Sequence, residues 1–466
     1  MKKTAIAALL AAALGAGSTA LTAGCGTSES DRWRYERIVY EEMPEVRSRD
    51  DAAARFQRLG ASPKLTLSDC YQMALYRSEA LAIDGEELAR LQAQFEQVRG
   101  GVFPRISFEG SYSRQDKPPT PSSGVQQSLT LNERTEYKFT GHQPIFGGFR
   151  EFYTLRQTNA LYRGQEHALR HARILLYGDV ADAFYAALEA GRELATTQDS
   201  LRLAEERLEE LVQRNRAGIS RRSEVLAQEA ETASIRATVE RLKGVLAVSV
   251  EVLKFLTGLP SARELEDVLP EPGDVPPVGD YLARAARERH DLRAAAERVR
   301  AAEEGIGVAR AGYLPTADLD VHYFTHREGV SAEIDWDLLL SFEVPIFEGG
   351  ITQARLREAR SAVRAAEFER ARLLRDIALQ VNRAFADLKA FQSELASLGT
   401  AVTSAEENYE IVQAEYRRNI VTNIEVLTAF DTLQRSRLER DRARFQAKLA
   451  AVRLAIETGE RPGGKP

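Results

Sequence analysis

Apolar and polar residues alternate strictly over one stretch in the second half of the chain. Between Ile334 and Val344 every second residue is apolar, and the positions between them include aspartate, serine and glutamate. A period of two is typical of a strand with one buried and one exposed face. A very long helical pattern begins after Gly350. The sequence therefore joins a strand with one apolar face directly to a long helix.

The same junction occurs twice because the chain is duplicated. A shift of 201 residues places PIFGG (144–148) over PIFEG (345–349), and more than a hundred residues then align without a gap. Upstream of the strands the shift is 211, and the difference falls in the Pro/Ser-rich loop at 115–127, which tolerates changes of length. The two halves are joined by a second Pro/Gly-rich stretch, so the internal repeat is the main architectural signal.

Each half is predicted to contain a helix, two strands, a long helix, a tight break and a returning helix. In the first half these are a helix near 67–100, strands near 105–114 and 127–143, a long helix near 148–217, a break at 216–220 and a helix to 258. In the second half they are a helix near 281–312, strands near 316–326 and 332–344, a long helix near 349–418, a break at 417–422 and a helix to 459.

The predicted helix lengths are consistent with a long helical hairpin in each half. An outgoing helix of about 70 residues is roughly 105 Å long. The returning helix has only about 40 residues, and the first helix, of about 34, makes up the difference if the two stack end to end. The predicted organisation is a leader (1–24), an extended lipid-anchored segment (25–66), a first repeat (67–268), a linker (269–280), a second repeat (281–459) and a disordered tail (460–466).

The predicted strands have the length and pattern of membrane strands. Each has about ten residues or more and one apolar face, which suits an oblique crossing of a bilayer. Four strands cannot close a barrel, and an open sheet edge cannot face lipid. Several copies must therefore share one barrel, with eight strands from two copies or twelve from three. The alternative, a soluble sheet packed on helices, would leave two long hairpins without a core.

Composition narrows the class of protein further. The 466 residues carry a formal charge of −6, with arginine dispersed along the helices, which makes nucleic acid a poor partner. Beyond the N-terminus there is no run of about 18 apolar residues that would form a membrane helix. The only cysteines, Cys25 and Cys70, have no neighbouring histidine, so a structural zinc site is excluded. A disulfide between the two is possible only if Cys25 is unmodified.

The first 25 residues have the pattern of a secretory leader that ends in a cysteine. A basic start precedes an apolar stretch and a run of small residues. The segment LTAGC resembles a bacterial lipoprotein signal, although Thr22 stands where that family usually has Leu, Val or Ile. The resemblance implies that Cys25 carries covalent lipid, including palmitate, and Gly26 after it implies the outer membrane. The alternative is an ordinary secreted protein with an incidental cysteine.

The duplicated order of elements, the PIFGG and PIFEG junctions and the two breaks followed by EVL resemble the TolC-like outer membrane efflux protein family over almost the whole mature chain. The resemblance implies a mainly α protein with membrane β-strands. Three copies would form a 12-stranded barrel that continues into a periplasmic α-helical barrel. Such a trimer is the passive exit duct of a tripartite pump, with a periplasmic adaptor and an inner-membrane transporter as partners, no enzymatic activity and no cofactor.

The resemblance also implies a gate at the helix breaks. The first position of an acidic ring falls on Glu425 and the next on Thr428, and crowded carboxylates would attract cations to a narrow pore. A latch would join Tyr416 to Glu224, while Val421 replaces a basic residue that some members carry. The alternatives are that both glutamates are ordinary solvated acids and that Tyr416 packs in a helix groove.

The tips of the two hairpins are the expected docking sites for the adaptor. The residues concerned are Gly218, Ile219, Ser220, Asn419, Ile420 and Val421. Two histidine pairs with a spacing of four, His167/His171 and His322/His326, lack a supporting acid or cysteine cluster, so no metal site is predicted. Two other functions remain open: the exit duct of a type I protein secretion system, and a periplasmic coiled-coil scaffold without a pore.

Overall fold

The computed structural model describes residues 36–41, 43, 46–114, 116, 133–261, 263–328, 332–418 and 420–460. The chain divides into two compact units. Unit 1 comprises Met1–Glu86, His167–Leu292 and Leu373–Pro466, and unit 2 comprises Glu87–Glu166 and Arg293–Arg372. Each unit takes segments from both halves of the duplicated sequence, so the compact units cut across the repeats instead of separating them.

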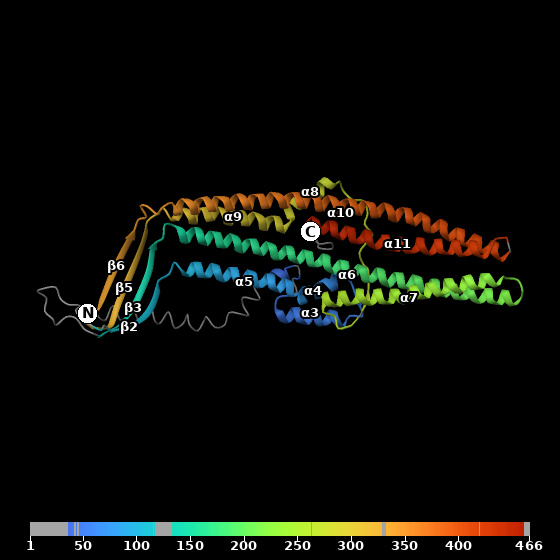
Figure 1. Cartoon of the computed structure of the whole chain (residues 1–466), viewed down its shortest axis with the longest axis horizontal. Coiled ribbons are helices and arrows are strands. Elements are labelled where there is room, and N and C mark those ends of the chain that lie inside the picture. The colour runs from blue at the N-terminus through green and yellow to red at the C-terminus, as the bar shows by residue number, and fades with distance from the viewer. Residues whose placement is uncertain are drawn as a thin grey trace. The chain divides into compact units, whose positions relative to one another are not determined.

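The helices follow the same order in each half, as Figure 1 shows. In the first half they are α4 (Leu67–Arg77), α5 (Glu79–Gly100), α6 (Arg150–Arg216) and α7 (Arg222–Thr257). In the second half they are α8 (Val278–Glu288), α9 (His290–Ala311), α10 (Ile351–Arg417) and α11 (Asn423–Glu457). The long helices α6 and α10 have 67 residues each, which confirms the long outgoing helix predicted for both halves.

The first predicted helix of each half is in fact two helices. In the first half, the helix predicted at 67–100 breaks at Ser78, whose backbone is extended and whose hydroxyl accepts a hydrogen bond from the Leu81 N–H at 3.3 Å. A serine that caps a helix N-terminus in this way stabilises a new start. The prediction of one continuous helix was therefore wrong there.

The break in the second half is at Arg289, which is buried. Its guanidinium donates hydrogen bonds to Asp291 at 2.7 and 3.0 Å and to the Glu457 carboxylate at 2.7 Å. These bonds hold Arg289 in an extended conformation between α8 and α9. Because α8 already begins at Val278, it also occupies the end of the segment predicted as a linker (269–280).

The N-terminal segment contains a helix where an extended chain was predicted. Within 25–66, the residues Arg49–Ala61 form α3. Ser48 caps this helix by accepting a hydrogen bond from the Asp51 N–H at 3.2 Å, and Asp50 adds a favourable charge in the first turn. Cys25 and the leader lie outside the described residues, so their predicted roles stay predictions.

Unit 2 contains a four-stranded antiparallel sheet in the order β2-β3-β5-β6. Its strands are β2 (Arg105–Arg114), β3 (Glu133–Phe146), β5 (Thr316–Arg327) and β6 (Trp336–Glu343). The strand predicted at 105–114 is confirmed. β3 ends at Phe146 instead of residue 143, because it continues through a register shift between Pro144 and Phe146. β2 and β6 are the edge strands.

The sheet has one apolar and one polar face. Phe108 pairs with Phe139, and Leu338 pairs with Val321, so apolar side chains meet across neighbouring strands on one face. These side chains are exposed in the single chain, and the most exposed among them are Ile106, Phe108, Tyr112, Trp336, Leu338, Leu340 and Phe342. An exposed apolar surface of this kind needs a lipid or protein environment.

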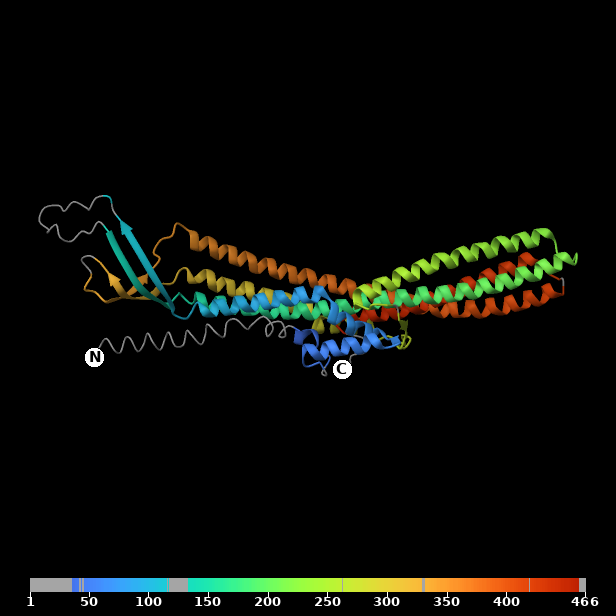
Figure 2. The ribbon, with the colours of Figure 1, turned by 90° about the horizontal axis from the view of Figure 1, so that it is seen from below.

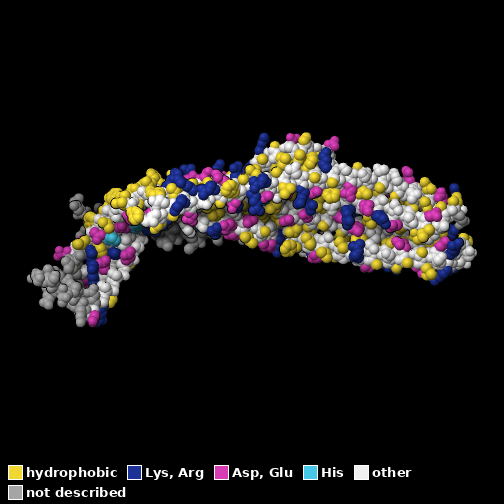
Figure 3. Space-filling model, turned by 45° about the horizontal axis from the view of Figure 1, so that its top comes forward, with side chains coloured by type: hydrophobic (Ala, Val, Ile, Leu, Met, Phe, Trp, Pro, Cys, Tyr) yellow, Lys and Arg dark blue, Asp and Glu magenta, His cyan; other side chains and the backbone are white. Residues whose placement is uncertain are grey.

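The strand-to-helix junctions repeat in conformation as well as in sequence. Gly148 and Phe149 have φ values of 66° and 63°, and their equivalents Gly349 and Gly350 have 61° and 85°. Phe149 therefore takes a left-handed conformation that glycine takes in the second half, and its ring packs edge-on against Phe146 at 5.1 Å. Figure 3 shows hydrophobic side chains on the surface of this strand-bearing unit.

Unit 1 buries apolar side chains between its helices. One cluster is formed by Ala285, Leu292, Ile377, Val381, Ala384, Leu388, Ala450 and Leu454. Two short strands, β1 (Lys64–Leu65) and β4 (Glu264–Leu265), pair in parallel. Cys70 is a buried free thiol, and burial raises its pKa to about 12.

Candidate functional site: the hairpin tips

The turn between α6 and α7 is tightly hydrogen-bonded. Gly218 has a φ of 77°, which favours glycine over residues with a side chain. The Asn215 side-chain amide donates to the Ser220 carbonyl at 2.7 Å, and the Ile219 N–H donates to the Arg214 carbonyl at 2.9 Å. The Ile219 side chain is left 64% exposed, so the first tip presents an apolar group at its surface.

The turn between α10 and α11 has the equivalent form. The Ile420 N–H donates to the Glu415 carbonyl at 3.0 Å, and Ile420 is 66% exposed, much like its equivalent in the first tip. Val421 packs partly buried against the core between the hairpins. Asn419 lies outside the described residues. Figure 2 shows that both turns lie at the same end of unit 1.

Glu425 and Thr428 lie on one exposed face at the start of α11. The Thr422 hydroxyl donates to the Glu425 carboxylate at 3.2 Å, and the Thr428 hydroxyl donates to the Ile424 carbonyl at 2.8 Å. A carboxylate in the first helical turn is stabilised by the helix dipole. Glu425 is therefore held at the tip with its charge facing solvent.

Glu224 occupies the equivalent first turn of α7, but it does not make the predicted latch. Its carboxylate accepts a hydrogen bond from the Ser220 hydroxyl at 2.5 Å. Tyr416 is 5% exposed and packs against the residues between the hairpins, where burial raises its pKa. The cluster around it is formed by Leu211, Val225 and Val426. The resemblance implied a bond between Tyr416 and Glu224. In the structure Glu224 bonds to Ser220, and Tyr416 packs in the apolar cluster.

Two arginines of α6 hold Tyr416 instead. The guanidinium carbon of Arg207 lies 4.1 Å from the centre of the Tyr416 ring, and that of Arg214 lies 4.9 Å from it. Arg207 also donates to the Asn423 side chain at 3.0 Å and to Glu210 at 2.9 Å. Arg207 therefore joins α6 to both helices of the second hairpin. Arg207 and Arg214 are seven residues apart, which places both on one face of α6. The sequence analysis did not recognise this spacing as a signal.

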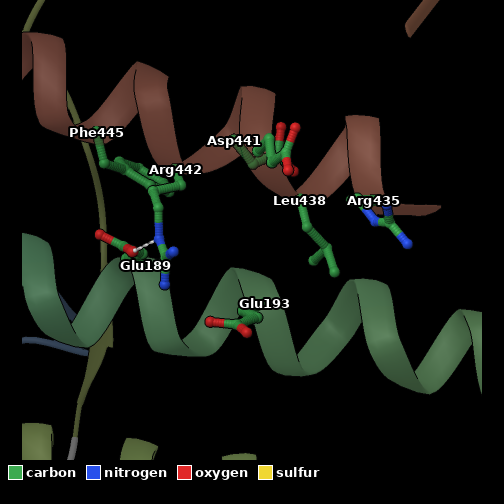
Figure 4. A pocket seen from close by; sticks show the side chains of 8 residues that line it. Glu189, Glu193, Arg435, Leu438, Asp441, Arg442 and Phe445 are labelled. Atoms are coloured by element: carbon green, nitrogen blue, oxygen red, sulfur yellow. Dashed lines mark hydrogen bonds and ion pairs between the residues drawn. The ribbon is translucent and has the colours of Figure 1, made fainter. Parts of the chain in front are cut away.

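A small cleft of about 190 Å³, lined mostly by charged residues, lies farther along unit 1 between α6 and α11 (Figure 4). Arg442 points at Glu189 across it and donates at 2.9 Å, and Gln446 donates to the same carboxylate at 3.3 Å. In a second ion pair the basic residue is on α6 and the acid is on α11: Arg192 lies 2.9 Å from Asp441. These crossed ion pairs hold the outgoing helix of one half to the returning helix of the other.

Among the described residues, no group of three or more His, Cys, Asp and Glu side chains could hold a metal ion. His167 stacks on His290 with ring centres 5.5 Å apart, and His322 bonds to Asp337. Among the described helices, none combines the length and apolar character needed to cross a membrane.

These features define a class of protein. A sheet with an exposed apolar face continues, through glycine-rich junctions, into two long helical hairpins whose tips carry exposed acids and apolar turns. An exposed apolar sheet face of this kind is typical of a protein that works in contact with lipid or with other protein surfaces.

The chain belongs to the outer membrane efflux protein family, because the family model described as "Outer membrane efflux protein" matches residues 70–259 and 281–460. It is similar to the antibiotic efflux pump outer membrane protein ArpC of Pseudomonas putida, with 25% identity over 384 residues, which covers 78% of this chain and 76% of ArpC. It is 25% identical to the outer membrane protein TolC of Escherichia coli over 412 residues, covering 84% and 82% of the two chains.

A solved structure has the same fold. The outer membrane protein VceC from Vibrio cholerae matches with a TM-score of 0.73 at 18% identity, over 85% of this chain and 96% of VceC. The chain is an outer membrane efflux component that acts as a duct and not as an enzyme, and the family needs no cofactor. The predicted family and fold class are thereby confirmed.

Proposed function

We propose that three copies of this chain close into one duct that passes small molecules from an inner-membrane transporter to the outside. The observation that carries the proposal is the open four-stranded sheet, with edge strands β2 and β6 and an exposed apolar face. Edge strands cannot face lipid unpaired, so β6 of one copy pairs with β2 of the next. An eight-stranded barrel is filled by its own side chains, whereas twelve strands leave a passage.

The two returning helices are covered differently, which supports a neighbouring copy. In α11, Ile456 is 8% exposed, and its Cδ1 lies 3.1 Å from where a Cβ on Gly178 of α6 would be. The 201-residue shift maps this contact onto Phe255 of α7 and Leu379 of α10, which are 82% and 63% exposed. Leu449 of α11 is likewise buried, whereas its equivalent in α7, Val248, is exposed. This face of α11 is therefore covered within the chain, and the equivalent face of α7 is left open.

A second copy covers this open face in the proposed trimer. Phe255 of one copy packs against Leu379 of the next, as Ile456 packs against α6 within the chain. The contact joins two different surfaces, and contacts of that kind close into rings when the rotation between copies allows it.

The hairpin tips form the gate of the proposed duct. Threefold symmetry places three Glu425 carboxylates around the axis, with Thr428 as the next ring position, and the ring attracts cations. Arg207 and Tyr416 keep the tip closed, and Glu224 stays with the first hairpin. The periplasmic adaptor engages the two turns, at residues 218–220 and 419–421, and opens the tip by parting the hairpins.

The proposed anchor is covalent lipid, and the proposed cargo is small molecules. Covalent lipid on Cys25 fixes the chain to the outer membrane, since several acyl chains at one residue bind firmly. Small molecules are the proposed cargo because relatives are named for their efflux, as in the antibiotic efflux pump protein ArpC. A protein secretion duct would share this architecture and differ in its partners.

A cross-linking experiment tests the trimer. In the double variant Phe255→Cys with Leu379→Cys, a short bifunctional maleimide is expected to join copies into species of two and three chains on a denaturing gel. The equivalence with Ile456 and Gly178 supports a distance between the two thiols that the reagent spans. Cys70 does not interfere, because it is buried.

The matched control keeps Phe255→Cys and moves the second thiol to Leu374→Cys, on the same helix but a different face; this pair is expected to stay unlinked. Uncross-linked chains in the first variant would contradict the proposed contact. Products that extend beyond three chains would show an open polymer in place of a closed ring.

A further inference from the structure

Two histidine–aspartate pairs lie on the polar face of the sheet. The Nδ1 of His142 on β3 is 2.8 Å from the Asp320 carboxylate on β5, and the Nδ1 of His322 on β5 is 2.7 Å from the Asp337 carboxylate on β6. Both imidazoles retain accessible surface, with 40% and 24% of their side chains exposed. Histidine side chains are visible on the strand-bearing unit in Figure 3.

The register of the sheet places the two pairs in neighbouring rows. One row across the strands contains Arg105, His142, Asp320 and Leu339. The next row contains Ser107, Thr140, His322 and Asp337. Residues directly opposite one another in a sheet share a face, so both rows point away from the apolar face.

A third row adds one more acid, which faces His142. Asp318 pairs with Ser341, and its carboxylate lies 3.9 Å from the Nε2 of His142. On the opposite side of the two rows, Glu109 and Lys138 pair with each other at 3.4 Å, so they add no net charge. The term His–Asp belt is used here for Arg105, His142, Asp318, Asp320, His322 and Asp337.

The belt contains more carboxylates than guanidinium groups. Asp318, Asp320 and Asp337 supply three negative charges per chain, and Arg105 supplies one positive charge. With its imidazoles counted as neutral, the belt therefore has a formal charge of −2 per chain.

We propose that the His–Asp belt is a second selectivity element, which makes the membrane segment of the duct prefer cationic solutes. The inference rests on the proposed function, because only a closed barrel turns the polar face into the wall of a lumen. Charges of one sign on a low-dielectric wall raise the local concentration of counter-ions. The belt lies at the helix-proximal end of the strands, so solutes meet it after they leave the helical part of the duct.

The test removes the contribution of the gate first. In a Tyr416→Ala, Glu425→Gln background, reversal potentials are measured across planar bilayers in a gradient of dilute KCl, where screening is weak. At pH 8 the ratio of K⁺ to Cl⁻ permeability is expected to fall at least threefold on adding Asp320→Asn with Asp337→Asn. The charge-conserving control, Asp320→Glu with Asp337→Glu, is expected to keep the ratio.

A second control replaces both histidines by glutamine. His142→Gln with His322→Gln removes no carboxylate, so this variant is expected to keep the ratio. Unchanged ratios in the asparagine variant would overturn the belt and leave the duct intact. A folded trimer without conductance in any variant would overturn the proposed function itself.

Discussion

Replacing Tyr416 by alanine is expected to raise the resting conductance of the reconstituted protein roughly 30-fold. Tyr416 lies between the guanidinium groups of Arg207 and Arg214, and each shielded cation–π contact contributes about 0.5–2 kcal/mol. Loss of about 2 kcal/mol from the closed state alone shifts the closed–open equilibrium by roughly that factor. Single-channel recordings measure the open probability directly.

The control for this prediction is an apolar residue on the same helix outside the cluster. Ile411 is 57% exposed, so Ile411→Ala is expected to leave the open probability unchanged. Arg207→Gln also removes the hydrogen bond to Asn423 and is expected to act in the same direction as Tyr416→Ala. If neither Tyr416→Ala nor Arg207→Gln changes the recordings, this contact is not what keeps the tip closed.

Replacing Asp267 by alanine is expected to lower the free energy of unfolding by about 3–5 kcal/mol. The Lys448 ammonium is buried, and it donates to the Asp267 carboxylate and to the Leu269 carbonyl, both at 2.6 Å. Removing one partner of a buried ion pair leaves the other charge uncompensated, which is the costly step. Thermal unfolding followed by circular dichroism in detergent measures the loss.

The matched variant replaces both charges with apolar residues. Asp267→Leu with Lys448→Met is expected to recover most of the lost stability, because apolar pairs of similar volume replace buried ion pairs at little cost. Tyr185, whose hydroxyl donates to Asp267 at 3.3 Å, loses a partner in both variants, so its contribution cancels. Equal stabilities of the wild type and Asp267→Ala would contradict the role of this ion pair.

Much of the fold could be predicted because repetition strengthens weak local signals. The alternation between Ile334 and Val344 predicted β6, and the structure has a strand at Trp336–Glu343. The two long helices were predictable within a few residues from continuous periodic patterns bounded by glycine junctions. At the first junction Phe149 takes a left-handed conformation like that of Gly350 in the second half, which the sequence did not predict.

The features that sequence analysis missed depend on contacts between distant segments. The break at Arg289 follows from its bond to Glu457, which is far away in the sequence, so local propensity predicted an unbroken helix. The same limit applies to Arg207, whose partners Tyr416 and Asn423 belong to the other half of the chain. The family resemblance implied a bond between Tyr416 and Glu224 at the hairpin tip. In the structure, Tyr416 contacts Arg207 and Arg214 instead.

The most direct test of the duct is the conductance of the purified protein in planar bilayers, with the wild type recorded beside Glu425→Gln. We expect a small cation-selective conductance in the wild type that divalent cations reduce, and weaker cation selectivity in the variant. These results would place a pore on the threefold axis with Glu425 at its narrow end. A well-folded trimer that conducts no ions, even with Tyr416→Ala, would contradict the account.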